Sequence, residues 1–289
     1  AATEQGRAES DPRWFGYAQA ALAPWWNEAA PPLPVWILRA TLRQQRHDFA
    51  GALADLDGLL VQDSSNAQAR LTRAVIHMVQ GRPQQAQTDC AALLGRASTL
   101  LVTACLSDAR SRNGGAAQSL DALQQMLATP VAQQSPLAEK LWALTLAAEL
   151  ALRLEGMGAA QAAFDAAFAA TRETGRDTYL ETLHADFLLE QGQAAQLLTR
   201  YGNEQRNDNL LLRVALAQQV TGDARLSATL DILRTRFAVA RARGEAIHAR
   251  EEAMLELHLA RNAQGALRAA QANWQTQREP LDARLLLEA

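Results

Sequence analysis

The sequence predicts an all-α protein, built as a right-handed superhelical solenoid of about seven antiparallel helix hairpins. Three observations predict this fold. Alanine dominates an apolar fraction of 48%, and alanine has the highest helix propensity of the common residues. No stretch alternates apolar and polar residues as a half-buried strand does. Pairs of small residues recur along the chain at one spacing, which indicates a structural repeat.

The repeat is clearest in the first part of the chain. Ala40 and Ala52 are 12 residues apart, as are Ala74 and Ala86, and the second pair follows the first by 34 residues. Weaker pairs continue the pattern at Ser107 and Ser119, Ala148 and Ala160, Ala185 and Leu197, Ala215 and Ser227, and Met254 and Ala266. Small residues let two antiparallel helices approach closely, and a hairpin of this kind buries its apolar face only by stacking on its neighbours.

Glycine marks the predicted turn inside most hairpins. The glycines lie at 81, 114–115, 156, 192 and 222, between the two small residues of a pair. Helix starts also agree with the pattern, because capping residues precede the second, fourth and sixth units. These are Asp63 to Asn66, Ser135 before Pro136, and Asp208 with Asn209. Residues 280–287 resemble the first helix of a further unit, and we expect them to form a C-terminal cap.

The N-terminal part does not follow the repeat. Residues 1–12 are polar and charged and are predicted to be disordered. A predicted helix follows, and four of the six tryptophans lie within residues 14–36. We therefore predict two parts: residues 1–32, a disordered start plus an N-terminal capping helix, and residues 33–289, the repeat domain. The alternative is an exposed aromatic patch that mediates self-association through Trp14, Trp25 and Trp26.

Residues at the recurring positions resemble the tetratricopeptide repeat family, in particular its bacterial members. Matching residues are Trp36, Ala40, Phe49 and Ala52 in the first unit, Ala74, Gly81 and Ala86 in the second, and Leu144, Ala148, Ala160, Phe164 and Ala167 in the fourth. The resemblance covers about residues 33–275. It departs from the family at Arg39 and Arg73, where leucine is usual, and at Pro83, where an aromatic residue is usual.

The resemblance implies a non-catalytic scaffold that binds a partner protein or peptide in a concave groove lined by the first helix of each unit. The groove residues expected from the spacing are Ile37, Thr41, Gln44, Leu71, Val75, Met78, Asp108, Arg112, Glu149 and Arg153. Two alternatives stay open. In the first, Leu71, Val75 and Met78 pack against the neighbouring unit rather than line the groove. The second concerns Arg112 and Arg153, which either bind an anion or pair with Asp108 and Glu149.

Other functional classes find little support in the sequence. A net charge of −3 gives no basic face for nucleic acid, and no apolar run is long enough for a membrane span. Phosphate-loop, Gly-x-Ser-x-Gly and His-Glu-x-x-His signatures are absent, so we expect no enzyme, no cofactor and no metal. The competing hypothesis is a metal protein or enzyme on a helical array, with His184 beside Glu181 or His248 beside Glu252 as ligands.

Two cysteines, Cys90 and Cys105, fall in helices that the repeat places side by side. Two buried thiols are the favoured interpretation, while the geometry also permits a disulfide. We expect the opening residues Ala1 to Gln5 to be what remains after removal of a signal peptide. We therefore expect a periplasmic or secreted protein, with the cytoplasm as the alternative.

Overall fold

The computed structural model describes residues 13–154, 157–243 and 248–289. Helices account for the regular structure of these residues, and no strand occurs among them, so the all-α prediction is confirmed. The described chain divides into two compact units, Arg13–Arg176 and Asp177–Ala289. The predicted disordered start at residues 1–12 lies outside the described residues, and the predicted boundary at residue 32 stays a prediction.

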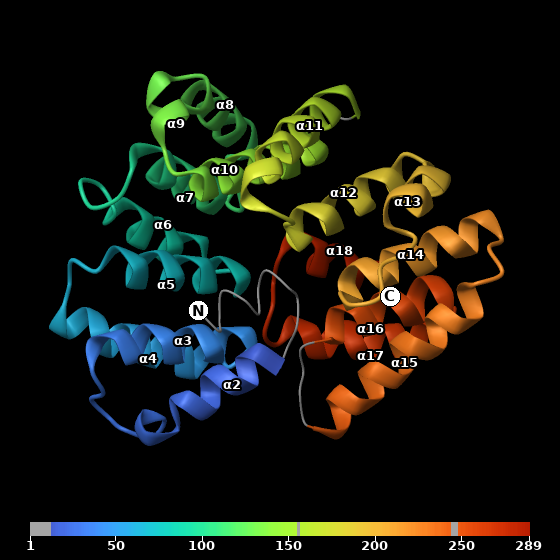
Figure 1. Cartoon of the computed structure of the whole chain (residues 1–289), viewed down its shortest axis with the longest axis horizontal. Helices are drawn as coiled ribbons and strands as arrows, with labels where there is room; N and C mark the ends of the chain where they lie inside the picture. Colours follow the sequence, from blue (N-terminus) through green and yellow to red (C-terminus); the bar gives the residue numbers. More distant parts are fainter. Residues whose placement is uncertain (1–12, 155–156, 244–247) are drawn as a thin grey trace. The chain divides into compact units, whose positions relative to one another are not determined.

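The first unit contains four helix hairpins (Figure 1). They pair α3 (Leu33–Gln45) with α4 (Phe49–Gln62), α5 (Ala67–Val79) with α6 (Pro83–Ala91), α7 (Thr99–Ser111) with α8 (Ala116–Leu127), and α10 (Leu137–Leu154) with α11 (Met157–Thr174). A short helix, α9 (Pro130–Gln134), follows α8. Each first helix contacts the first helix of the next hairpin. The second helices α4, α6 and α8 also contact the first helix of the hairpin that follows them. This is the stacking that the repeat predicts.

The N-terminal segment packs on the first hairpin. Helix α2 (Arg13–Ala21) and the 3₁₀ turn η1 (Ala23–Trp25) precede α3, and α2 contacts it. Leu22 joins Val35 and Leu42 in a buried cluster, against which the partly buried Trp25 and Trp26 pack. These contacts place apolar side chains over α3, as a capping segment requires.

The second unit contains three hairpins and a final helix. It pairs α12 (Thr178–Glu190) with α13 (Ala194–Tyr201), α14 (Asp208–Thr221) with α15 (Leu226–Ala242), and α16 (Ala249–Met254), which continues into the π-helical turn η2 (Leu255–Leu259), with α17 (Ala263–Trp274). Helix α18 (Pro280–Glu288) contacts α16 and α17 in the manner of an unpaired first helix. The core of this unit includes Leu212, Leu233 and Phe237.

The small residues that define the repeat are buried, with one exception. Ala40, Ala52, Ala74 and Ala86 are 0% exposed, whereas Ser227 is exposed. Thr229, 7% exposed, takes the buried position in α15. The assignment of Ser227 was wrong, because the register of α15 is shifted so that Thr229 faces the core in its place.

Turns and helix starts agree with the sequence in part. Gly81, Gly114, Gly192 and Gly222 have φ between 68° and 86°, a region that favours glycine because it lacks a Cβ atom. Gly156 lies outside the described residues. Asn66 caps α5 by accepting the N–H of Ala69 at 3.0 Å. The other two predicted caps are wrong: the hydroxyl of Ser135 donates to the carbonyl of Val131, and Asn207 caps α14.

Cys90 and Cys105 form a disulfide that joins α6 to α7, with their Cα atoms 5.5 Å apart. The favoured interpretation of two buried thiols is therefore wrong, and the alternative that the repeat geometry permitted is correct. Successive hairpins place the two cysteines on facing helices, where both belong to a buried cluster with Ala74, Met78 and Val102. The bond adds a covalent link between the second and third hairpins.

Candidate functional site

The candidate site is the face that α3, α5, α7 and α10 form within the first unit. Nine of the ten predicted groove residues lie in these helices, and Arg112 is the C-cap residue of α7. Its apolar part comes from α3 and α5. Ile37, Leu71 and Val75 are half-buried: each packs against a core cluster on one side and leaves part of its surface open. Met78 is only 2% exposed and belongs to the core, as the packing alternative expected, so it offers no side chain to a groove.

Polar side chains of α3 extend this apolar part. Thr41 and Gln44 are half-buried, one and two turns along the helix from Ile37. The hydroxyl of Thr41 donates to the carbonyl of Ile37 at 2.8 Å, within its own helix. Because a hydroxyl oxygen still has lone pairs, Thr41 keeps the capacity to accept a hydrogen bond from a ligand.

The charged part of the face comes from α7 and α10. Nε of Arg112 lies 2.8 Å from a carboxylate oxygen of Asp108, one turn earlier, and Asp108 is 8% exposed. The pairing alternative is therefore correct for Arg112. Arg153 is exposed and donates from Nη2 to the hydroxyl of Ser111 at 3.0 Å, which links α10 to α7. Glu149 is half-buried on the same helix as Arg153.

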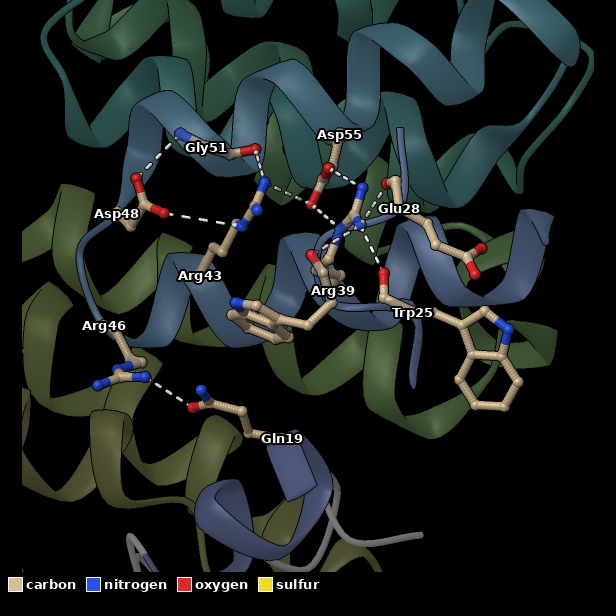
Figure 2. A network of polar contacts seen from close by, with 10 residues as sticks. Gln19, Trp25, Glu28, Arg39, Arg43, Arg46, Asp48, Gly51 and Asp55 are labelled. Atoms are coloured by element: carbon tan, nitrogen blue, oxygen red, sulfur yellow. Dashed lines mark hydrogen bonds and ion pairs between the residues drawn. The ribbon is translucent and has the colours of Figure 1, made fainter. Parts of the chain in front are cut away.

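A buried ion pair holds the first hairpin together (Figure 2). The guanidinium of Arg39 donates to both carboxylate oxygens of Asp55, at 2.9 and 2.6 Å, and both side chains are less than 5% exposed. Nη1 of Arg39 also donates to the carbonyls of Trp25, Trp26 and Glu28 at 2.8–3.0 Å. One arginine thus connects α3 to α4 and to the N-terminal segment.

A second copy of this pair lies in the next hairpin. Arg73 donates to both oxygens of Asp89, at 2.8 and 2.6 Å, and the two residues are 16 positions apart, as Arg39 and Asp55 are. Hydrogen bonding to Asp89 raises the pKa of Arg73. The arginines that depart from the family pattern therefore have a structural role. The sequence contained a signal for these pairs, because Asp55 and Asp89 are separated by the same 34 residues as Arg39 and Arg73.

The histidines proposed as metal ligands make other contacts. Nδ1 of His184 lies 2.9 Å from the hydroxyl of Tyr201, and His184 is 2% exposed. His248 packs against the ring of Phe237, and its Nε2 lies 3.8 Å from Asp208. Among residues 13–154, 157–243 and 248–289, no group of three or more His, Cys, Asp or Glu side chains is placed to hold a metal ion.

Comparison with known proteins adds two distant structures. A tetratricopeptide repeat protein from Parabacteroides merdae is 12% identical, with a TM-score of 0.46, over 99% of this chain and 95% of its own. Human IFIT1, solved as a dimer with m7Gppp-AAAA, is 12% identical, with a TM-score of 0.47, over 98% of this chain and 68% of its own. The sequence matches no family profile and no curated protein. The description of the fold therefore rests on the helix packing above.

One further observation concerns membranes. In the part of the chain that the structure describes, none of the helices combines the length and the apolar character that crossing a bilayer requires.

Proposed function

We propose that this protein is a non-catalytic scaffold that binds a partner protein or peptide on the face formed by α3, α5, α7 and α10. The observation that carries the proposal is the mixed character of that face. Half-buried apolar side chains on α3 and α5 continue into ionic groups on α7 and α10. A peptide with an apolar segment followed by a charged one would find complementary groups there.

The structure of the face also suggests how it achieves specificity. Ile37, Leu71 and Val75 are anchored in the core on one side, so they lose little side-chain entropy when a ligand covers them. Arg112 is already held by Asp108, which leaves exposed Arg153 as the more accessible cation for an acidic group of the partner. We therefore expect apolar contacts to supply most of the affinity and Arg153 to set orientation.

The experiment is a selection of peptides that bind the full chain, followed by affinity measurements on two matched variants. Val75→Glu places a charge on the first-helix face, and Val61→Glu makes the same change on α4, where Val61 is 86% exposed. We expect Val75→Glu to weaken peptide binding by about tenfold or more, and Val61→Glu to leave it unchanged. Thermal unfolding of both variants checks that the fold is intact.

Equal affinities of the two variants, at intact fold, would contradict the proposal. A milder change, Gln44→Ala, tests the polar part of the face without placing a charge beside the core. Binding of m7Gppp-AAAA, which human IFIT1 was solved with, is measured beside the peptides by fluorescence anisotropy. Net charge −3 disfavours that ligand, and tight binding of it would replace the peptide proposal with a nucleic-acid one.

Self-association through the tryptophan-rich segment is the second candidate function. Trp25 and Trp26 are only partly buried, so some aromatic surface remains open beside the first hairpin. Light scattering over a concentration series distinguishes a monomer from a self-associating protein, with Trp26→Ala as the variant.

For the compartment, we propose the periplasm or the cell exterior. The disulfide between Cys90 and Cys105 supports an oxidising environment. Mass spectrometry of the unreduced protein, purified from its native source under alkylating conditions, tests this proposal. Two alkylated thiols would favour the cytoplasm.

A further inference from the structure

A polar cavity of about 440 Å³ lies beside the turn of the third hairpin, and none of the predicted groove residues lines it. The residues around it belong to α6, the end of α7, the turn and the first half of α8. They are Gln87, Ser107, Arg110, Asn113, Gly114, Gly115, Gln118, Ser119 and Ala122. Arg110 is the only charged residue of this set, so the lining carries positive charge and no carboxylate.

Ser119 supplies a buried donor without a partner. It is 3% exposed, and its Oγ atom forms no hydrogen bond with the described residues. The equivalent position of the first, second and fourth hairpins is alanine, at Ala52, Ala86 and Ala160. A hydroxyl at this position costs stability as long as nothing satisfies it, and a ligand in the cavity that this residue lines would supply the missing partner.

The start of α8 lies at the same cavity and is also open. Its N-cap residue is Gly115, which has no side chain to accept a hydrogen bond from the first turn. Gly114 before it has a φ of 86° and nothing within 4 Å of where a Cβ would be. By contrast, Asp48 caps α4 and Ser98 caps α7. The N–H groups and the positive end of the helix dipole at α8 therefore remain available to an anion.

From these observations we propose that the cavity binds a small oxyanion, either a phosphate or a carboxylate group. The guanidinium of Arg110 supplies the charge, the hydroxyl of Ser119 donates one hydrogen bond, and the first-turn N–H groups of α8 donate others. Phosphate and carboxylate share this chemistry, and they come from different sources: a free phosphate, or an acidic group of a bound peptide. The proposal does not depend on the first-helix face.

The test is calorimetric titration of the full chain with inorganic phosphate and, separately, with acetate, in chloride buffer at constant ionic strength. We expect one site per chain. Arg110→Ala should weaken binding by about tenfold. Arg172→Ala is the matched control, because Arg172 is likewise exposed and lies in the last turn of its helix, and it should leave binding unchanged.

Ser119→Ala separates a ligand role from a structural one. It should weaken anion binding by about threefold, and it should raise the melting temperature of the anion-free protein because it removes an unsatisfied hydroxyl. Tighter binding of phosphate assigns the site to phosphate groups and tighter binding of acetate to carboxylates, and either result supports the proposal. Failure of both anions to bind, or equal binding by the wild type and Arg110→Ala, would overturn it.

Discussion

The first two hairpins contain the same ion pair in different surroundings. In α3–α4, Arg39 and Asp55 are 4% and 3% exposed, and three carbonyls of the N-terminal segment surround the guanidinium. Asp55 also pairs with Arg43, which is 21% exposed. In α5–α6, Asp89 is equally buried and likewise pairs with two arginines, but both of them, Arg70 and Arg73, are 20% exposed. The repeat thus determines which side chains meet, and the neighbouring segments determine how strongly the fold depends on them.

The largest effect is expected where the charge left behind has no access to water. Asp55→Ala removes the carboxylate and leaves the buried guanidinium of Arg39 without its ionic partner. We expect the free energy of unfolding to fall by about 3–5 kcal/mol, measured by urea denaturation. Asp57→Ala is the control on the same helix, because Asp57 is 61% exposed, and it should change stability by less than about 1 kcal/mol. Similar effects of the two changes would show that burial of the Arg39 pair is unimportant.

Loss of the disulfide should have the next largest effect. The bond between Cys90 and Cys105 closes a loop of 15 residues and ties the second hairpin to the third. The double variant Cys90→Ala with Cys105→Ala should lower the free energy of unfolding by about 3 kcal/mol. Adding reductant to the wild type should reproduce most of this loss and leave the double variant unaffected. An equal response of both proteins to reductant would contradict the prediction.

Asp89→Ala should cost less than Asp55→Ala although the two residues are equivalent in the repeat. Arg70 and Arg73 reach solvent, so water can replace the lost carboxylate. We expect a loss of about 1–2 kcal/mol in the free energy of unfolding. A loss as large as that of Asp55→Ala would mean that the position in the repeat, and not the surroundings, determines the effect.

The smallest effect concerns pH and also belongs to the second hairpin. Burial lowers the pKa of His77 below its ordinary value of 6.5, while Asp89 opposes the shift. The unfolded chain therefore binds a proton more readily, and stability is full above pH 6.5 and declines as pH falls through the lower pKa of the folded state. NMR titration of the His77 ring measures that pKa, and His77→Gln should flatten the decline. A folded-state pKa above 6.5 would contradict the sign.

Much of the fold followed from the sequence, because the repeat encodes it several times. The 12-residue spacing of small residues located the hairpins, and the glycine turns confirmed them independently. Among the paired positions of the repeat, the register failed at Ser227, where Thr229 is the residue that faces the core. Caps such as Ser135 were misplaced because a hydroxyl near a helix start can bond elsewhere, and the sequence does not fix its rotamer.

The site was harder to predict than the fold. Spacing placed Met78 on the same helix face as Leu71 and Val75, which is correct for the helix alone. Met78 is nevertheless buried in the core cluster, because burial depends on how the neighbouring helices pack and the spacing does not encode that. The partner of Arg39 could have been predicted from the sequence, since Asp55 and Asp89 recur at the same 34-residue spacing as Arg39 and Arg73. The cavity at Ser119 was not, because it depends on how α6, α7 and α8 leave a gap between them.

The most direct measurement is a pair of double-mutant cycles, one for Arg39 with Asp55 and one for Arg73 with Asp89. Urea denaturation of the wild type, the single alanine variants and the double variants gives the coupling energy of each pair. We predict a coupling energy for the buried Arg39 pair that exceeds that of the Arg73 pair by at least about 1 kcal/mol. Equal coupling energies would contradict the conclusion that the surroundings, rather than the repeat, set the strength of this interaction.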